Sequence, residues 1–268
     1  MCGIVGAISR QNTTGVLLAA LSRLEYRGYD SAGIAVLNSH GLQVRKRAGK
    51  LKGLIASIKR QPLDGQLSLG HTRWATHGLP SEVNAHPHTD CGGRLAIVHN
   101  GIIENYAPLK ERLLAKGHRF RSTTDTEVIA HLIEEYANDR PVERAFRQAL
   151  KELKGSYAIG LIARGEPKRL FGARNGSPLV VGIGREEGFL ASDVTAFLGR
   201  TRRVLYLNDQ EVVELTAEGP TLTTLDGRPI QRRVSTVNWS LAEARKEGHA
   251  HFMLKEIQEQ PTAIEQTL

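Results

Sequence analysis

The order of elements along the chain is the sequence feature that most constrains its fold. Short β-compatible runs come first, a block of helical pattern follows, and short β-compatible runs then return. The block predicts three helices in succession, at about 105–116, 126–137 and 142–153. A doubly wound parallel fold would alternate strand and helix throughout. We therefore expect a layered α+β fold.

The remaining elements follow from the same kind of pattern. An early helix is expected from about Val16 to Leu24, where apolar residues recur at three- and four-residue intervals, and Gly28 is its expected stop. Most of the remaining chain consists of short runs of strand length, and turn-forming or charged residues bound each run. The expected strands are 3–9, 33–37, 43–48, 67–71, 95–99, 156–163, 169–172, 179–183, 188–191, 204–207, 211–215 and 221–225.

Composition narrows the class of protein. With 268 residues and 40% hydrophobic content, the chain can fill a substantial core. No uncharged apolar stretch approaches the roughly 20 residues of a membrane span, and the opening residues lack the pattern of a signal peptide. We therefore expect a cytoplasmic protein with no membrane partner. The net charge of +8 comes from scattered Lys and Arg, and aromatic content is only 5%, so we expect no nucleic-acid partner.

Metal binding is a second class that the pattern disfavours. The only two cysteines, Cys2 and Cys91, have the spacing of neither a zinc site nor a disulfide framework. Four histidines between residues 71 and 88 raise the alternative of a metallohydrolase. That segment contains no His-Glu-x-x-His helix, and its nearby carboxylates are only Glu82 and Asp90. We therefore expect no metal ion and no cofactor.

Cys2 becomes the first residue of the chain if the initiator methionine is removed. The thiolate is the attacking species, and a free thiol with a pKa of about 8.5 is only a few per cent ionised near pH 7. An adjacent α-amino group, with a pKa of about 7.7–8.0, can accept the proton directly or through one water. Cys2 would then supply both nucleophile and base. The alternative is that Cys2 is a small apolar residue at the start of a buried strand.

A polar loop follows the strand expected at 67–71. Residues 70–78 read Gly-His-Thr-Arg-Trp-Ala-Thr-His-Gly, and polar groups gathered at a strand end suit a small-molecule site. Arg73 can hold a carboxylate through two parallel hydrogen bonds, and Trp74 can close an apolar wall. The alternatives are that Arg73 forms an ion pair on the surface and that Trp74 is a partly buried packing residue.

Val98-His99-Asn100-Gly101 closes the apolar strand expected at 95–99. Asn-Gly commonly forms a turn. The Asn100 amide and the unshielded Gly101 N–H can also supply two donors, which is the minimum for an oxyanion hole. Both interpretations remain open at this stage.

Asp125 precedes the helix expected at 126–137. Thr124 and Glu127 have the spacing of a capping box, which would place Asp125 in the first helical turn. There it would either complement the helix dipole or bind a substrate ammonium group.

Taken together, these segments resemble the glutaminase domain of the glucosamine-6-phosphate synthase (glutamine–fructose-6-phosphate aminotransferase) family, whose members are N-terminal-nucleophile amidotransferases. The resemblance covers essentially the whole chain. Trp74 distinguishes it from the glutaminases of amidophosphoribosyltransferase and asparagine synthetase. The matching segments are Cys-Gly-Ile-Val-Gly at 2–6, Leu-Glu-Tyr-Arg-Gly-Tyr-Asp-Ser-Ala-Gly at 24–33, His-Thr-Arg-Trp-Ala-Thr-His-Gly at 71–78, Asn-Ala-His-Pro-His at 84–88, Val-His-Asn-Gly-Ile-Ile-Glu-Asn at 98–105, Asp-Thr-Glu-Val-Ile-Ala-His at 125–131 and His-Phe-Met-Leu-Lys-Glu-Ile-Gln-Glu-Gln-Pro at 251–261.

The resemblance implies a four-layer αββα sandwich of two mostly antiparallel sheets, the Ntn-hydrolase fold. It also implies catalytic roles. Cys2 would attack the glutamine carboxamide while its own α-amino group moves the proton, and Asn100 with the Gly101 N–H would hold the oxyanion. A glutamyl thioester would form, and water would hydrolyse it.

The substrate contacts implied by the resemblance come from four residues. Arg73 would bind the α-carboxylate of glutamine and Asp125 its α-ammonium, with Thr76 and His77 making further polar contacts. L-Glutamine is therefore the expected small-molecule partner.

Three further residues receive expectations from the resemblance. Arg27 would lie in a loop that orders over the site, and Trp74 near the passage of ammonia to a second domain. Cys91 lies in a turn where the family tolerates variation, so it is expected to be a bystander.

The resemblance also implies a domain organisation. Residues 2–240 would form the glutaminase domain, and residues 241–268 would begin a linker to a sugar-isomerase domain that this sequence lacks. Fructose 6-phosphate would bind only through that absent domain. We expect the full-length enzyme to be a homodimer, with a monomer as one option for the isolated domain. There are two alternatives to this function. The chain could be the glutaminase domain of another Ntn amidotransferase, or a non-catalytic sugar-phosphate-binding module with a structural Cys2.

Overall fold

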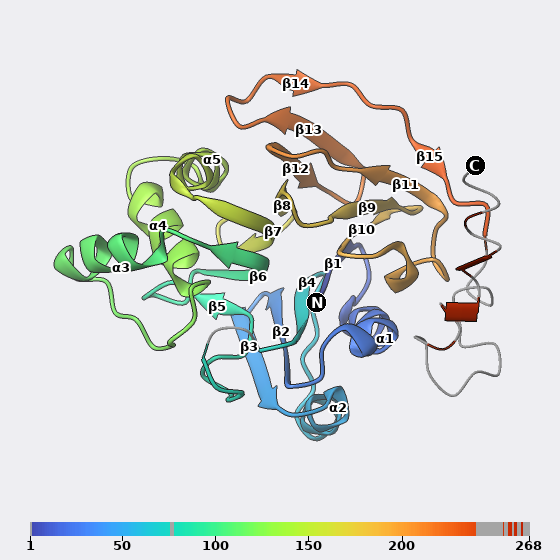
Figure 1. Cartoon of the computed structure of the whole chain (residues 1–268), viewed down its shortest axis with the longest axis horizontal. Helices are drawn as coiled ribbons and strands as arrows, with labels where there is room; N and C mark the ends of the chain where they lie inside the picture. Colours follow the sequence, from blue (N-terminus) through green and yellow to red (C-terminus); the bar gives the residue numbers. More distant parts are fainter. Residues whose placement is uncertain are drawn as a thin grey trace.

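The computed structural model describes residues 2–75 and 78–239, together with residues 254, 257, 258, 260, 261 and 264. Two β-sheets pack face to face at its centre, and helices cover the outer face of each (Figure 1). Every strand pair within the two sheets is antiparallel. The expected αββα layering of an α+β fold is confirmed.

The first sheet has eight strands, in the order β15-β11-β9-β10-β1-β4-β2-β3. Its centre is β1, which pairs with β10 on one side and with β4 on the other. The N-terminal residues therefore lie in the middle of the sheet. The strands are β1 (Gly3–Ser9), β2 (Ser31–Asn38), β3 (Gly41–Ala48), β4 (Leu67–Arg73), β9 (Val180–Ile183), β10 (Glu187–Ala191), β11 (Arg203–Tyr206) and β15 (Ser235–Thr236).

The second sheet has seven strands, in the order β14-β13-β12-β8-β7-β6-β5. Its longest pairing joins β6 to β7 over nine residues on each strand. This pairing holds β6 rigidly opposite the first sheet. The strands are β5 (His88–Thr89), β6 (Leu95–Ile103), β7 (Gly155–Ala163), β8 (Leu170–Asn175), β12 (Glu211–Leu215), β13 (Pro220–Thr224) and β14 (Pro229–Ile230).

Five α-helices form the outer layers, two over the first sheet and three over the second (Figure 1). The block of three helices expected in the middle of the chain is confirmed, with bounds within one residue of those expected. The helices are α1 (Thr14–Leu24), α2 (Leu51–Arg60), α3 (Tyr106–Ala115), α4 (Glu127–Ala137) and α5 (Val142–Glu152), with short 3-10 helices η1 (Glu25–Arg27) and η2 (Val194–Ala196).

The alternation of side chains along β1 explains how one strand joins two apolar layers. Val5 and Ala7 pack with α1 and α2, whereas Ile4 and Ile8 pack into the layer between the two sheets. Successive side chains of a strand point to opposite faces. A central strand of a sandwich is therefore apolar on both faces, which is why residues 3–9 read as a continuous apolar run.

Helix α2 and several short strands were not expected from the sequence. In α2, Leu51, Leu54 and Ile58 are buried at helical spacing, but the helix has only ten residues and contains Gly53, a poor helix former. Packing against the first sheet compensates for this weak local preference. Strands β5, β14 and β15 have two residues each, too few to show any periodicity.

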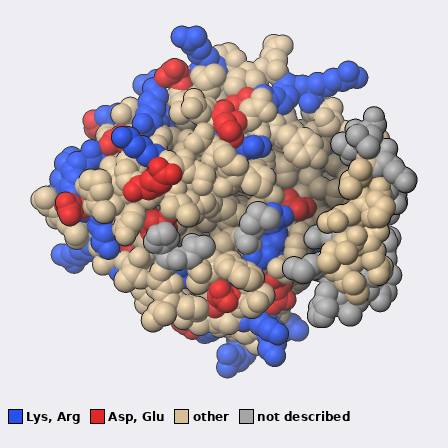
Figure 2. Space-filling view, viewed as in Figure 1, with Lys and Arg blue, Asp and Glu red and all other residues tan. Residues whose placement is uncertain are grey.

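The surface carries charges of both signs. Figure 2 shows Lys and Arg side chains interspersed with Asp and Glu on the face that it displays, without a single continuous basic area. This distribution agrees with the scattered positive charge of the sequence. Among the described residues, no helix combines the length and the apolar character that crossing a bilayer would require.

Candidate active site

The alternation of side chains along β4 and β6 points polar residues of both sheets into the space between the sheets. On β6, Ala96 and Val98 face the layer between the sheets, so Asn100 shares their face. On β4, Leu67 and Leu69 face the same layer, which puts Arg73 on that face as well. The candidate site therefore lies where the two sheets end, between their inner faces.

Cys2 lies directly before β1 and touches both sheets. The Trp74 N–H donates to Cys2 Sγ at 3.2 Å, and the Asn100 Nδ2 donates to the Cys2 carbonyl oxygen at 2.9 Å. Burial raises the pKa of the Cys2 thiol, while the Trp74 N–H and the positive charge of Arg73 act in the opposite direction. In this partly buried setting the thiol needs a base to become a nucleophile.

His71 orients the Asn100 amide. The His71 Nε2 lies 2.9 Å from Asn100 Oδ1, and because an amide oxygen only accepts, Nε2 must carry the proton and donate. Complete burial lowers the pKa of His71 to about 3, so the ring is neutral at pH 7. With its oxygen held by His71, Asn100 turns its donor Nδ2 towards Cys2. His71 is thus a positioning residue for Asn100.

Asn100 and Gly101 lie inside β6, so the turn interpretation is wrong. The strand continues to Ile103, four residues beyond the expected end, and Gly101 pairs with Tyr157 of β7. Gly101 has a φ of 130°, and a Cβ there would lie only 2.0 Å from the carbonyl oxygen of Ser156. A glycine is therefore required for the strand to pass this point beside the cavity.

Arg73 is buried at the end of β4, with 4% exposure, so the surface ion pair considered for it is wrong. Its Nη2 donates to the Gly78 carbonyl oxygen at 3.3 Å. Burial lowers the pKa of Arg73, while the nearby Cys2 and Asp125 oppose that shift. Trp74 is 44% exposed, and its ring meets the Tyr29 ring edge-on at 5.6 Å between centroids.

Asp125 is also buried, and it precedes α4. Its Oδ2 accepts a hydrogen bond of 2.8 Å from the Ile103 N–H at the end of β6. The capping box expected from Thr124 and Glu127 is wrong, because α4 begins after Thr126 and the Glu127 carboxylate instead accepts from the N–H groups of residues 121 and 122. Asp125 therefore belongs to the loop that faces the cavity and not to the first helical turn.

One narrow cavity of about 20 Å³ brings Cys2, Arg73 and Asp125 together, whereas Asn100 is not among the residues that line it. A wider hollow of about 800 Å³ runs along α5 on the surface, but no cysteine lines it. The chemistry of the lining groups, rather than their volume, therefore identifies the candidate site. The residues that line the narrow cavity are Cys2, Arg73, Trp74, His86, His99, Gly101, Thr124, Asp125 and Thr126.

His86 and His99 line the cavity but received no role from the sequence. Burial lowers the pKa of both rings. The His99 Nδ1 lies 2.9 Å from Thr126 Oγ1, and the His86 ring lies 4.1 Å from the His71 ring, centroid to centroid. Both histidines were inside the motifs singled out above. The missing information was how the folded chain brings those motifs together.

Three of the expected site residues lie elsewhere or outside the described part of the chain. Arg27 does not line the cavity; it ends η1, where its Nη1 lies 2.6 Å from an oxygen of Asp193. Thr76 and His77 fall outside the described residues. Their expected substrate contacts stay predictions.

The comparisons with known sequences identify relatives of this chain. A family model described as a glutamine amidotransferase domain matches residues 71–199. The chain is 57% identical to a glutamine–fructose-6-phosphate aminotransferase (isomerizing) of Thermus thermophilus and 50% identical to that of Thermococcus kodakarensis. Both alignments cover 100% of this chain, but only 44% and 45% of the two relatives. The chain thus spans less than half the length of these relatives.

Similar solved structures match the fold. The glutamine phosphoribosylpyrophosphate amidotransferase from B. subtilis aligns with a TM-score of 0.73 at 26% identity, over 84% of this chain and 49% of that one. A glutamine aminotransferase class-II domain protein from Silicibacter pomeroyi aligns with a TM-score of 0.56 at 15% identity, over 84% of this chain and 99% of that one. The second likeness concerns the fold alone. The predicted Ntn-type sandwich is confirmed.

Proposed function

From the premise that this chain belongs to the glutamine–fructose-6-phosphate aminotransferase family, as its glutamine amidotransferase domain, we propose that it hydrolyses L-glutamine to glutamate and ammonia through a thioester on Cys2. The observation that carries this proposal is the lining of one cavity by a thiol, a guanidinium and a carboxylate. These groups belong to Cys2, Arg73 and Asp125.

The proposed reaction begins at the Cys2 sulfur. The α-amino group of a processed Cys2 takes the thiol proton, and Sγ bonds to the carboxamide carbon of glutamine. The oxyanion that develops is held by Asn100 Nδ2 and the Gly101 N–H. Its collapse breaks the C–N bond, and the amine returns the proton to the departing ammonia. Water then cleaves the thioester and releases glutamate.

Two features of Asn100 support its part in this scheme. Its Nδ2 already points towards Cys2, where it donates to the carbonyl oxygen at 2.9 Å. Its Oδ1 accepts from His71, so the amide cannot turn over without losing that bond. A donor fixed in advance costs no reorganisation during the reaction, which is the main advantage of a protein oxyanion site.

The two buried charges fit the α-amino-acid end of the substrate. Arg73 would bind the α-carboxylate with a two-pronged set of hydrogen bonds, and Asp125 would bind the α-ammonium. Thr76 and His77 would add polar contacts, while Trp74 would lie near the ammonia passage and Arg27 in a loop over the site. The cavity of about 20 Å³ holds about one water molecule, so glutamine must displace part of its walls on entry.

The longer protein would use the ammonia. We place the glutaminase domain at residues 2–240 and the start of a linker at 241–268, in the cytoplasm. The relatives are more than twice as long as this chain, and their name includes fructose 6-phosphate as acceptor. In the full-length enzyme, proposed here to be a homodimer, a sugar-isomerase domain would combine the ammonia with fructose 6-phosphate to give glucosamine 6-phosphate.

Ammonia release from glutamine by the purified chain tests the proposal. Protein whose N-terminus is a free Cys2, verified by intact mass, should release ammonia, and protein with a chemically blocked α-amine should not. Equal ammonia release by both forms would exclude the α-amino group as the base. No release by either form would favour the second candidate, a sugar-phosphate-binding module with a structural Cys2.

A further inference from the structure

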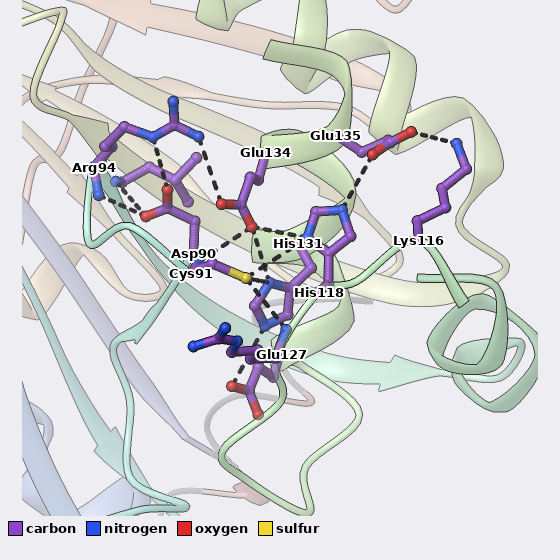
Figure 3. A network of polar contacts seen from close by, with 11 residues as sticks. Asp90, Cys91, Arg94, Lys116, His118, Glu127, His131, Glu134 and Glu135 are labelled. Atoms are coloured by element: carbon purple, nitrogen blue, oxygen red, sulfur yellow. Dashed lines mark hydrogen bonds and ion pairs between the residues drawn. The ribbon is translucent and has the colours of Figure 1, made fainter. Parts of the chain in front are cut away.

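The second cysteine lies in a cluster of groups that the proposed glutaminase reaction does not use. Cys91, His118, His131 and Glu134 each direct one S, N or O atom to a common centre, and these four atoms lie within 4.8 Å of one another (Figure 3). We propose that this cluster is a structural binding site for one Zn²⁺ ion per chain.

The spacing of the four atoms fits a tetrahedral zinc site. Cys91 Sγ lies 3.8 Å from His118 Nδ1 and 3.5 Å from His131 Nδ1. Glu134 Oε2 lies 2.9 Å from His118 Nδ1 and 3.2 Å from His131 Nδ1. Zn–S bonds of about 2.3 Å and Zn–N or Zn–O bonds of about 2.0–2.1 Å give tetrahedral edges of about 3.3–3.6 Å. These four distances lie within about half an ångström of such edges, and the other two, which are at most 4.8 Å, would shorten by up to about 1 Å on binding.

The outer nitrogens of both imidazoles face carboxylates. His118 Nε2 lies 3.1 Å from Glu135 Oε2, and His131 Nε2 lies 3.6 Å from Glu127 Oε1. A zinc-bound histidine commonly donates its other N–H to a carboxylate, which fixes the tautomer and the orientation of the ring. In this cluster the inner Nδ1 atoms would bind the metal and the outer Nε2–H of His118 would donate to Glu135. The outer Nε2 of His131 faces Glu127 at 3.6 Å, beyond hydrogen-bond distance.

A hydrogen-bond network without metal is the alternative arrangement of the same atoms. Each ring nitrogen of His118 faces a carboxylate oxygen, and such oxygens only accept hydrogen bonds. The His118 Nδ1–H would then share Glu134 Oε2 with the Cys91 N–H, and His131 Nδ1 lies between that oxygen and the Cys91 thiol. A zinc ion replaces these protons by one central charge that all four donor atoms share.

The donor set selects the metal. One sulfur, two imidazole nitrogens and one carboxylate oxygen suit Zn²⁺, whereas Mg²⁺ and Ca²⁺ prefer oxygen ligands. The side chains of His118, His131 and Glu134 are at most 9% exposed, which suits a closed structural site. The Arg119 N–H donates to Cys91 Sγ at 3.3 Å and would stabilise a bound thiolate. Binding releases the Cys91 thiol proton to solvent.

The site would join three separate segments. Cys91 lies in the turn between β5 and β6, His118 lies after α3, and the other two ligands lie on α4. Strand β6 carries Asn100 and Gly101, and the loop before α4 carries Asp125. A metal ion here would therefore stabilise the elements that support the candidate active site without touching it.

Metal binding can be measured on the intact protein without an activity assay. We expect one Zn²⁺ per chain by elemental analysis, and a rise of about 5 °C or more in the midpoint of thermal unfolding when Zn²⁺ is added to metal-free protein. Co²⁺ should give a thiolate-to-metal charge-transfer band. Absence of both the bound Zn²⁺ and the band would overturn the proposal and leave a hydrogen-bond network.

Three variants test the role of Cys91 as a ligand and of Glu135 as the partner of His118, with Cys2 as a control. Cys91→Ser should abolish the Co²⁺ band and lower Zn²⁺ affinity by about 100-fold, and Glu135→Gln should lower affinity by about 10–100-fold while retaining the band. Cys2→Ser, which alters the other cysteine, should retain both the band and the affinity. A band that persists in Cys91→Ser, or disappears in Cys2→Ser, would contradict the assignment. Unchanged affinity in Glu135→Gln would show that the His118 contact to Glu135 is not part of the site.

Discussion

The chain places its two cysteines in contrasting surroundings. Around Cys2, His71 Nε2 and His99 Nδ1 lie against the uncharged side chains of Asn100 and Thr126, and burial lowers the pKa of both rings. Around Cys91, the ring nitrogens of His118 and His131 all face carboxylate oxygens. The same residue types thus form a neutral shell in one place and a charged cluster in the other.

The difference shows that neighbouring charges decide what a cysteine can do. Among the residues that line the cavity at Cys2, the charged side chains beside the neutral histidines are Arg73 and Asp125, to which we assign the amino-acid end of the proposed substrate. Carboxylates behind His118 and His131 make those rings good metal ligands. The first arrangement suits chemistry on a bound molecule, and the second suits a fixed ion.

The largest expected effect separates the two cysteines by activity. Cys2→Ala should lower the rate of ammonia release from glutamine by about 10³-fold or more, because it removes the nucleophile. Cys91→Ala is the matched control, and its rate should stay within about threefold of the parent at a temperature where both are folded. A Cys2→Ala variant as active as the parent would exclude the thioester.

Next in size is the effect of the Asn100 donor. Asn100→Ala should lower kcat by about 10²–10³-fold, the usual cost of losing one oxyanion donor. Asn100→Asp keeps the shape of the side chain but replaces its donor by an acceptor, so kcat of this variant should fall by a similar factor. Steady-state ammonia release measures both. If Asn100→Asp kept the parental kcat, the oxyanion role would be wrong.

A smaller effect tests the charge that faces Cys2. Arg73→Lys should raise KM for glutamine by about 10–100-fold, because a point charge cannot replace two parallel charge-assisted hydrogen bonds. Arg23→Lys provides a control, since Arg23 Nη1 donates to the Ala196 carbonyl oxygen outside the cavity. An unchanged KM for Arg73→Lys would remove Arg73 from the substrate site.

The smallest expected effect concerns stability near the neutral histidines. The pKa values of His71 and His88 are lowered to about 3 by complete burial, whereas unfolded histidine has a pKa of about 6.5. Between these values the unfolded chain binds more protons. The free energy of unfolding should therefore fall as the pH drops below 6.5, by about 2 kcal/mol per histidine at pH 5.

Urea unfolding at pH 7 and pH 5 measures this loss. His88→Asn should reduce the loss of unfolding free energy between the two pH values, because it removes one buried titrating ring. His40 is exposed, so His40→Ala is the control and should leave that loss unchanged. A free energy of unfolding that does not change between these pH values would show that His71 and His88 are not held neutral.

Much of the fold could be predicted because local periodicity and packing agree. Strand 3–9 was predicted at its observed bounds, and the three central helices within one residue. The extension of β6 could not be predicted, since it depends on Gly101 adopting a φ of 130° while paired with β7. Nothing in the local sequence distinguishes that conformation from a turn.

The candidate site was predictable in part for a similar reason. Cys2, Arg73 and Asp125 belong to separate motifs, yet each carries a reactive or charged group whose use can be inferred one residue at a time. The cluster at Cys91 could not be inferred that way, because Glu134 lies 43 residues from Cys91 in the chain. Only the packing of α4 against the β5–β6 turn brings them together.

Labelling with a glutamine-analogue electrophile tests the central claim most directly. After incubation with the analogue, peptide mapping should locate one adduct, on Cys2, in chains whose N-terminal amine is free, and excess glutamine should prevent it. An adduct on Cys91 instead of Cys2, or equal labelling and full activity in chains that retain the initiator methionine, would contradict the account.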